Sequence, residues 1–166
     1  MSMFEDNHYR WRETYFVLFD SRKQPPLKTV EKTLAALSEA YELRNPSKGQ
    51  NGRFESLTVI SPDDFAALDI CYTAGDEVRE QGIALAKELR AMAVTPEELA
   101  RLKQIAQFDA RFDVLHFEQV VDLDADDEVD EVLDPSALLL VLNALAKLTD
   151  GIAVDPQSGT ILDEEQ

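Results

Sequence analysis

The chain has 166 residues, of which 45% are hydrophobic, so it is long and apolar enough for a single domain with a substantial core. Its formal net charge is −17, from 33 acidic residues against 16 Lys and Arg. A field of this sign repels phosphate backbones and anionic lipids, so neither nucleic-acid binding nor membrane docking is expected.

The first part of the chain predicts a strand and then a helix. Residues 13–20 are rich in aromatic and β-branched side chains and are expected to form a buried first strand. After Pro25 and Pro26, apolar residues recur on one helical face, at Val30, Leu34, Leu37 and Tyr41. This helix should end before Asn45-Pro46, because a residue that precedes proline disfavours the α conformation. Residues 45–53 are expected to form a loop.

The middle of the chain predicts a hairpin and two helices. Residues 54–60 and 65–73 have the composition of two strands joined by a turn. One helix is expected from about Asp76. Another begins at Thr95, which can cap the free amide of Glu98, and should end near residue 107. The residues expected on the buried sides are Val78, Leu85, Ala86 and Leu89 in the first helix, and Leu99, Leu102, Ile105 and Ala106 in the second.

The last part predicts a strand, an acidic segment, a helix and a hairpin. Residues 111–121 alternate in the manner of a fourth strand and lead directly into the acidic run 122–134. Asp134 and Pro135 favour the start of a helix over residues 136–149, which is apolar around most of its circumference and is expected to be buried on more than one side. Residues 152–162 contain a turn sequence between two short β-rich runs, which predicts a small hairpin.

This order of elements predicts an α+β fold. We expect a ferredoxin-like βαββαβ antiparallel sheet with helices on one face, extended by a C-terminal helix and a small β-hairpin. Residues 1–12 are expected to be a flexible N-terminal segment, and residues 13–166 a single domain. Within the domain, residues 13–121 would be the ferredoxin-like core, 122–134 an acidic linker loop and 135–166 the helix–hairpin unit. Many functions share this fold, so it does not by itself indicate an activity.

The acidic run is the first candidate site. It holds eight acids and no Lys or Arg in thirteen residues. Acids stand at positions 1, 3, 5, 7 and 9 of an EF-hand-like count, as Asp122, Asp124, Asp126, Glu128 and Asp130. However, Asp127 replaces the glycine of position 6 and Leu133 replaces the bidentate glutamate of position 12. Three interpretations stay open: a solvated linker, a docking surface for a basic protein partner, and a calcium site.

Four side chains on two expected strands are the second candidate site. His116 and Glu118 are two residues apart and so share a sheet face, and Asp69 and Cys71 on a neighbouring strand would have to share it. Together the four would suit a transition metal or acid–base chemistry, whereas the plainer interpretation is a half-exposed strand with ordinary polar residues. Cys71 itself is expected to be a buried or half-buried packing residue whose thiol pKa the acidic surroundings raise.

The leading functional hypothesis is therefore a non-enzymatic partner-binding or regulatory module. The alternatives are a divalent-cation-binding protein that uses residues 122–134, and an enzyme with its site near Cys71 and His116. No cofactor other than calcium is expected. The basic and aromatic tract 8–12 is expected to fold back onto acidic surface. Both sides of strand 111–121 are partly apolar, which predicts that the second sheet face is covered. The cover would be either the C-terminal unit or a second subunit, which would form a homodimer through the sheet. A cytoplasmic location is expected, because the first residues lack the apolar core of a signal peptide.

Overall fold

A computed structural model describes residues 8–91, 93, 95–119 and 136–162 of the chain. In this part the fold is α+β, with an antiparallel sheet of seven strands in the order β2-β3-β4-β5-β1-β6-β7. The strands are β1 (Tyr9–Phe19), β2 (Glu42–Lys48), β3 (Phe54–Ser61), β4 (Ala66–Ala74), β5 (Ala110–Gln119), β6 (Ile152–Asp155) and β7 (Thr160–Ile161). The α-helices are α1 (Leu27–Ala35), α2 (Asp76–Arg90), α3 (Pro96–Ile105) and α4 (Ser136–Thr149), and short 3₁₀ turns lie at Ser21–Lys23, Gln50–Gly52 and Pro62–Asp64.

The expected α+β class is confirmed, but the ferredoxin-like arrangement is not, because the strand order differs. Strands β2 to β5 follow one another as neighbours, and β1 then pairs with β5 on one side and with β6 on the other. The predicted order also lacked β2, which lies at a sheet edge where the end of a helix and the start of a loop were expected. Pro46 and two irregularities in the pairing with β3 hide the β pattern of this strand, and such features also protect an edge from pairing with another chain.

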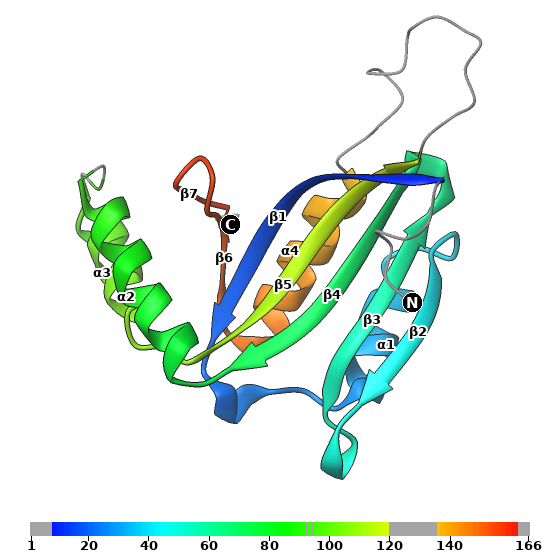
Figure 1. Ribbon diagram of the computed structural model, residues 1–166, viewed down its shortest axis with the longest axis horizontal. Helices are drawn as coiled ribbons and strands as arrows, with labels where there is room; N and C mark the ends of the chain where they lie inside the picture. Colours follow the sequence, from blue (N-terminus) through cyan, green and yellow to red (C-terminus); the bar gives the residue numbers. More distant parts are fainter. Residues whose placement is uncertain (1–7, 92, 94, 120–135, 163–166) are drawn as a thin grey trace, which may run out of the picture.

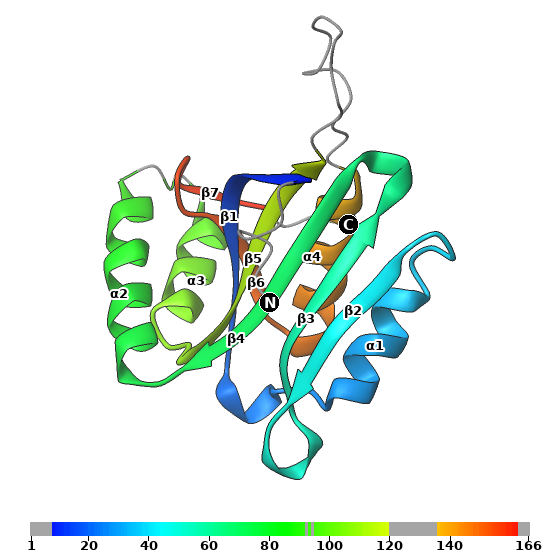
Figure 2. The ribbon, with the colours of Figure 1, turned by 45° about the vertical axis from the view of Figure 1, so that its right-hand side comes forward.

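Helices pack against both faces of the sheet, so the expectation of helices on one face was wrong, although α2 and α3 meet the second face mainly at β1 and β6. Val17 belongs to the main core beneath α1 and α4, whereas the next residue, Leu18, packs with residues of α2 and α3. Successive residues of a strand point to opposite faces, and here both positions are apolar and buried. Figures 1 and 2 show α1 and α4 behind the sheet, and α2 and α3 side by side beyond its β6–β7 end.

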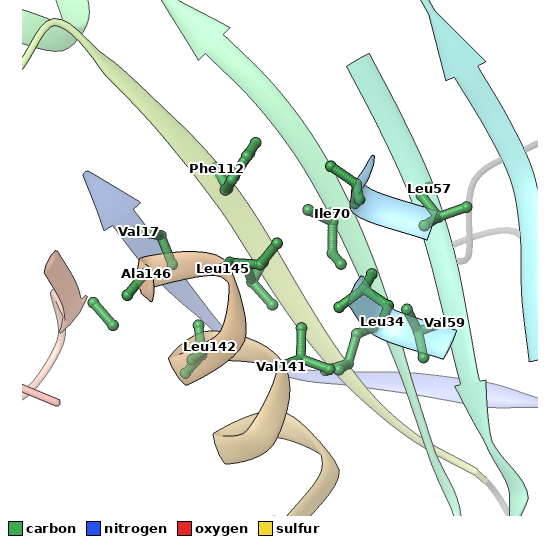
Figure 3. Close-up of a cluster of buried hydrophobic side chains, with 14 of the residues drawn as sticks. Val17, Leu34, Leu57, Val59, Ile70, Phe112, Val141, Leu142, Leu145 and Ala146 are labelled. Carbon is green, nitrogen blue, oxygen red and sulfur yellow. The ribbon is translucent and has the colours of Figure 1, made fainter. Parts of the chain in front are cut away.

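The main core lies between α4 and the sheet. Figure 3 shows the apolar stripe of α4 directed toward the strands, and its labelled members are Val141, Leu142, Leu145 and Ala146. Phe112 of β5 has no exposed surface and lies at the centre of an aromatic group. Its ring centroid is 4.7 Å from that of Phe19, 5.4 Å from that of Phe54 and 6.3 Å from that of Tyr72. This group joins β1, β3, β4 and β5 into one packed unit.

Two boundaries near the N-terminus differ from expectation. Strand β1 begins at Tyr9, so the last four residues of the expected flexible segment 1–12 belong to the sheet. Helix α1 ends at Ala35, although its apolar pattern continues to Tyr41. Leu37 and Tyr41 still pack against the main core, from the connection to β2 rather than from a helix. The periodicity therefore predicted burial correctly and helix length incorrectly.

The other predicted helices and strands are present within the described residues, but α4 is not buried on more than one side, because Leu139 and Leu140 are exposed. Helix α3 begins with a capping box, in which the Thr95 hydroxyl accepts from the Glu98 amide and the Glu98 carboxylate accepts from the Thr95 amide. Helix α4 and the hairpin of β6 and β7 lie where the sequence placed them. Within the described ranges, none of the helices combines the length and the apolar character that a bilayer crossing requires.

Candidate interaction site

The acidic candidate site lies outside the described residues. Asp122, Asp124, Asp126, Glu128 and Asp130 all fall in the segment between residues 119 and 136. Among the described residues, no group of three or more His, Cys, Asp or Glu side chains is placed to hold a metal ion. The calcium site therefore stays a prediction from the sequence.

The prediction that Asp69, Cys71, His116 and Glu118 form one site is wrong, because the two pairs lie on opposite faces of the sheet. In the pairing of β4 with β5, Leu68 stands opposite His116 and Asp69 stands opposite Leu115. Residues directly opposite each other share a face, so Asp69 and Cys71 face away from His116 and Glu118. The two pairs are thus separated by the thickness of the sheet, and they do not converge on one substrate or one metal ion.

His116 and Glu118 belong instead to a buried polar cluster with β1. The His116 ring is 1% exposed, and its Nδ1 lies 2.7 Å from Oε2 of Glu13. The Glu118 carboxylate is 3% exposed, and Arg10 and Arg12 donate to its Oε1 at 2.9 Å and 2.7 Å. The basic tract at the start of the chain therefore does contact an acid, but as the first part of β1 beside β5 and not by folding back onto acidic surface. The contact joins two neighbouring strands and has a structural role.

Cys71 is exposed, not buried or half-buried as expected, but its surroundings make it a poor nucleophile. Partial desolvation of the thiol by the residues packed around it raises its pKa most, and the negative charges of Asp69 and Asp113 raise it further. A raised pKa lowers the fraction of thiolate at neutral pH, and the thiolate is the reactive form. The expected direction of the shift is thus confirmed.

A reactivity measurement checks this shift. We expect iodoacetamide to alkylate Cys71 at pH 7.5 more slowly than it alkylates a free cysteine peptide, with a rate that is still rising above pH 9, because the raised pKa lowers the fraction of thiolate at each of these pH values. The variant Asp113→Asn removes one of the carboxylates and should speed the reaction at pH 7.5, whereas Asp63→Asn should leave it unchanged. A native thiol that reacts as fast as the peptide at pH 7.5 would contradict the shift.

A groove between α2 and α3 is the strongest candidate for an interaction site. It has a volume of about 360 Å³ and is lined by Ile83, Ala86, Lys87, Arg90, Leu99, Leu102, Lys103 and Ala106. Ile83 is 44% exposed and Leu99 is 40% exposed, and these two large aliphatic side chains line the same depression. The charged residues of this lining are all cations, in a chain whose acids outnumber its bases two to one.

Local sequence explains why two helices stand close together here. Asp76 and Glu77 occupy the first turn of α2, where the helix dipole favours negative charge, and the capping box starts α3. The connection between the helices is short, so they form an antiparallel pair. A Cβ atom at Gly82 would lie 3.1 Å from the carbonyl oxygen of Ile105, so the missing side chain lets the two backbones approach closely.

The two helices present the groove with the same spacing. On α2 the lining residues are Ile83, Ala86, Lys87 and Arg90, and on α3 they are Leu99, Leu102, Lys103 and Ala106. Each set follows the i, i+3, i+4, i+7 pattern of a single helical face. In each set the first two positions are apolar and the third is a lysine. The groove therefore has an apolar floor with a lysine contributed by each wall.

A larger hollow lies beside the groove, between the start of α3 and the β6–β7 hairpin. Its volume is about 590 Å³, and its charged lining residues are Glu97, Glu98 and Arg101. Both signs of charge are present, and the Glu98 carboxylate already accepts from the Thr95 amide at the helix cap. The charges that line this hollow therefore do not indicate one class of ligand.

The sequence interpretation missed the groove because it assigned the apolar residues of both helices to the core. Leu99 was expected to face inward, and Ile83 was not singled out. The repeated pattern of two apolar residues and a lysine, sixteen residues apart, is the signal that could have revealed it.

Comparison of the chain with protein-family models, curated proteins and solved structures finds no match.

Proposed function

We propose that this protein is a non-enzymatic partner-binding module and that the groove between α2 and α3 is its contact surface. The observation that carries the proposal is the pair of exposed aliphatic side chains, Ile83 and Leu99, that face one apolar depression with a basic rim. Exposed apolar surface of this kind, bounded by polar residues, is typical of sites that bind another protein.

The size of the groove suits a helical segment of a partner. The first and last lining residues are seven residues apart on each side of the groove, which corresponds to a length of about 10 Å at 1.5 Å per residue. About two turns of a ligand helix fit that length, at about 5.4 Å per turn. Completing the burial of Ile83 and Leu99 would contribute about 2 kcal/mol, since each is already more than half buried. That contribution supports a weak or transient complex unless charged groups add to it.

Site-specific photo-crosslinking in cells of the native host tests the proposal. A photoreactive amino acid at Ile83 or Leu99 should form a discrete adduct, because these side chains would contact the partner. The same amino acid at Ala84, which is exposed on α2 but lines a different depression, serves as the control and should form none. Lys87→Glu together with Lys103→Glu should suppress the adduct. The absence of an adduct at both groove positions would refute the proposal.

The acidic run carries two further proposals that rest on its composition alone. A basic protein partner would bind residues 122–134 through charge complementarity. The second candidate function is cation binding by Asp122, Asp124, Asp126, Glu128 and Asp130. Calorimetric titration with calcium and magnesium distinguishes the two proposals, because the absence of binding heat at millimolar metal would rule out the cation site. The single cysteine, which has no partner for an intrachain disulfide, favours a cytoplasmic setting for the protein.

A further inference from the structure

The groove between α2 and α3 has a charge opposite to that of the rest of the chain. Its charged lining residues, Lys87, Arg90 and Lys103, are all cations, whereas the chain as a whole has a net charge of −17. We infer that its occupant is an acidic amphipathic helix of a partner protein. This inference rests on the proposed partner-binding function and specifies the chemistry of the partner.

The arrangement of the lining defines that helix. Apolar residues from α2 and α3 form the floor, so the ligand needs an apolar stripe on one face. Lys87 comes from one wall and Lys103 from the other, so the ligand needs carboxylates on both flanks of its stripe. Leu or Ile at i, i+3, i+4 and i+7, with Glu or Asp beside them, meets both requirements.

The helix dipole does not account for the whole pattern. Lys87 and Arg90 lie in the last turn of α2, and Lys103 lies in the last turn of α3, where cations stabilise a helix even without a ligand. That effect requires no exposed apolar side chains beside the cations. Ile83 and Leu99 are nevertheless exposed in the same groove, and their exposure is what a partner would relieve.

A second copy of this chain is a poor occupant. A two-fold interface places the same patch on both subunits, so it would set Lys87, Arg90 and Lys103 against the same three cations of the other copy. Like charges facing each other across an interface oppose association. Anionic membranes and nucleic acids present extended negative surfaces, and these would meet the repulsion of the whole acidic chain.

A short acidic helix avoids most of that repulsion. At an ionic strength of 0.15 M, charges farther apart than about 8 Å are largely screened. A ligand of about two turns seated between α2 and α3 therefore senses the three cations that line the groove more strongly than the distant acids that contribute most of the net charge. The attraction is local, so it should weaken in 1 M salt, where the screening length falls to about 3 Å.

Fluorescence anisotropy with the intact protein and three labelled peptides tests the inference. The first peptide has about 14 residues, or roughly four helical turns, with Leu at i, i+3, i+4 and i+7 and Glu on both flanks. The second replaces each Glu by Gln, and the third replaces each Glu by Lys. We expect the Glu peptide to bind about tenfold more tightly than the Gln peptide at 0.15 M salt, and the Lys peptide to bind least.

Charge-reversed variants of the protein supply the matched comparison. Lys87→Glu with Lys103→Glu should abolish the preference for the Glu peptide. Lys28→Glu with Lys32→Glu makes the same change on exposed residues of α1, outside the groove, and should preserve it. Ile83→Asp or Leu99→Asp should remove binding of all three peptides, with circular dichroism to show that the variant is folded.

The outcomes separate this inference from the proposed function. If the Gln or Lys peptide binds as tightly as the Glu peptide and Ile83→Asp removes that binding, the groove is a contact surface but the inference is overturned. If no peptide binds and no crosslink forms at Ile83 or Leu99, both are overturned. Self-association that Ile83→Asp abolishes, or binding to phosphatidylglycerol vesicles that Lys87→Glu abolishes, would assign the groove to another occupant and overturn the inference. A tenfold preference for the Glu peptide that depends on Lys87 and Lys103 is the result that supports it.

Discussion

Replacing Phe112 by alanine is expected to lower the free energy of unfolding by about 3–5 kcal/mol. The side chain has no exposed surface, and its ring contacts the aromatic rings of three other strands. The substitution removes the transfer free energy of the ring and leaves a cavity that four strands are too closely packed to close. For a domain of this length we expect a fall in melting temperature of about 10 °C, measured by calorimetry alongside urea titration.

Phe65→Ala is the matched control for this prediction. It makes the same chemical change at a side chain that is 38% exposed, so its effect should be less than about 1 kcal/mol. Phe112→Leu should lie between the two, because leucine fills part of the volume. If Phe112→Ala cost no more than Phe65→Ala, β5 would not be the centre of the sheet, and the strand order given above would be wrong.

Removing Arg10 and Arg12 together is expected to destabilise the protein by about 3 kcal/mol, far more than the two single changes added together. Both guanidinium groups donate to Oε1 of Glu118, whose side chain is 3% exposed. Either single Arg→Ala variant leaves one partner in place and should cost less than about 1 kcal/mol. The double variant leaves a buried carboxylate with neither arginine, which is the costly case. Urea titration of the four proteins in a double-mutant cycle measures the difference.

Two further variants make this cycle decisive. Adding Glu118→Gln to the double variant should recover part of the loss, because the buried charge is then absent. Arg44→Ala breaks an ion pair with Glu42 in which both side chains are about half exposed, and it should cost less than about 1 kcal/mol. Additive effects of the two single changes would show that neither arginine compensates for loss of the other at Glu118, which would contradict this prediction.

The local elements could be predicted from the sequence because local patterns determine them. The cap at Thr95, the apolar helix α4 and the last hairpin follow from residues a few positions apart. Strand β2 could not be predicted, because Pro46 and its polar neighbours carry no β pattern, and only pairing with β3 makes the segment a strand. The end of α1 was missed because Leu37 and Tyr41 continue the apolar period outside the helix.

The arrangement of the sheet and the candidate sites depends on contacts between distant residues. Alternation within each strand correctly placed Asp69 with Cys71 and His116 with Glu118, but the faces of the two pairs depend on the register of β4 against β5. A shift of one residue exchanges the faces, and no single strand encodes that choice. Exposure of Leu99 likewise depends on where α3 packs against α2, which its own periodicity does not define.

The most direct test of the groove is methyl NMR of the full chain, labelled at Ile and Leu methyl groups and titrated with the acidic amphipathic peptide. The methyl resonances of Ile83 and Leu99 should show the largest shifts and should saturate together. Those of Leu139 and Leu140, which are equally exposed on α4, should stay unchanged. Unchanged Ile83 and Leu99 resonances at a saturating concentration of peptide, or the largest shifts on α4 or the sheet, would contradict the assignment of the groove as the contact surface.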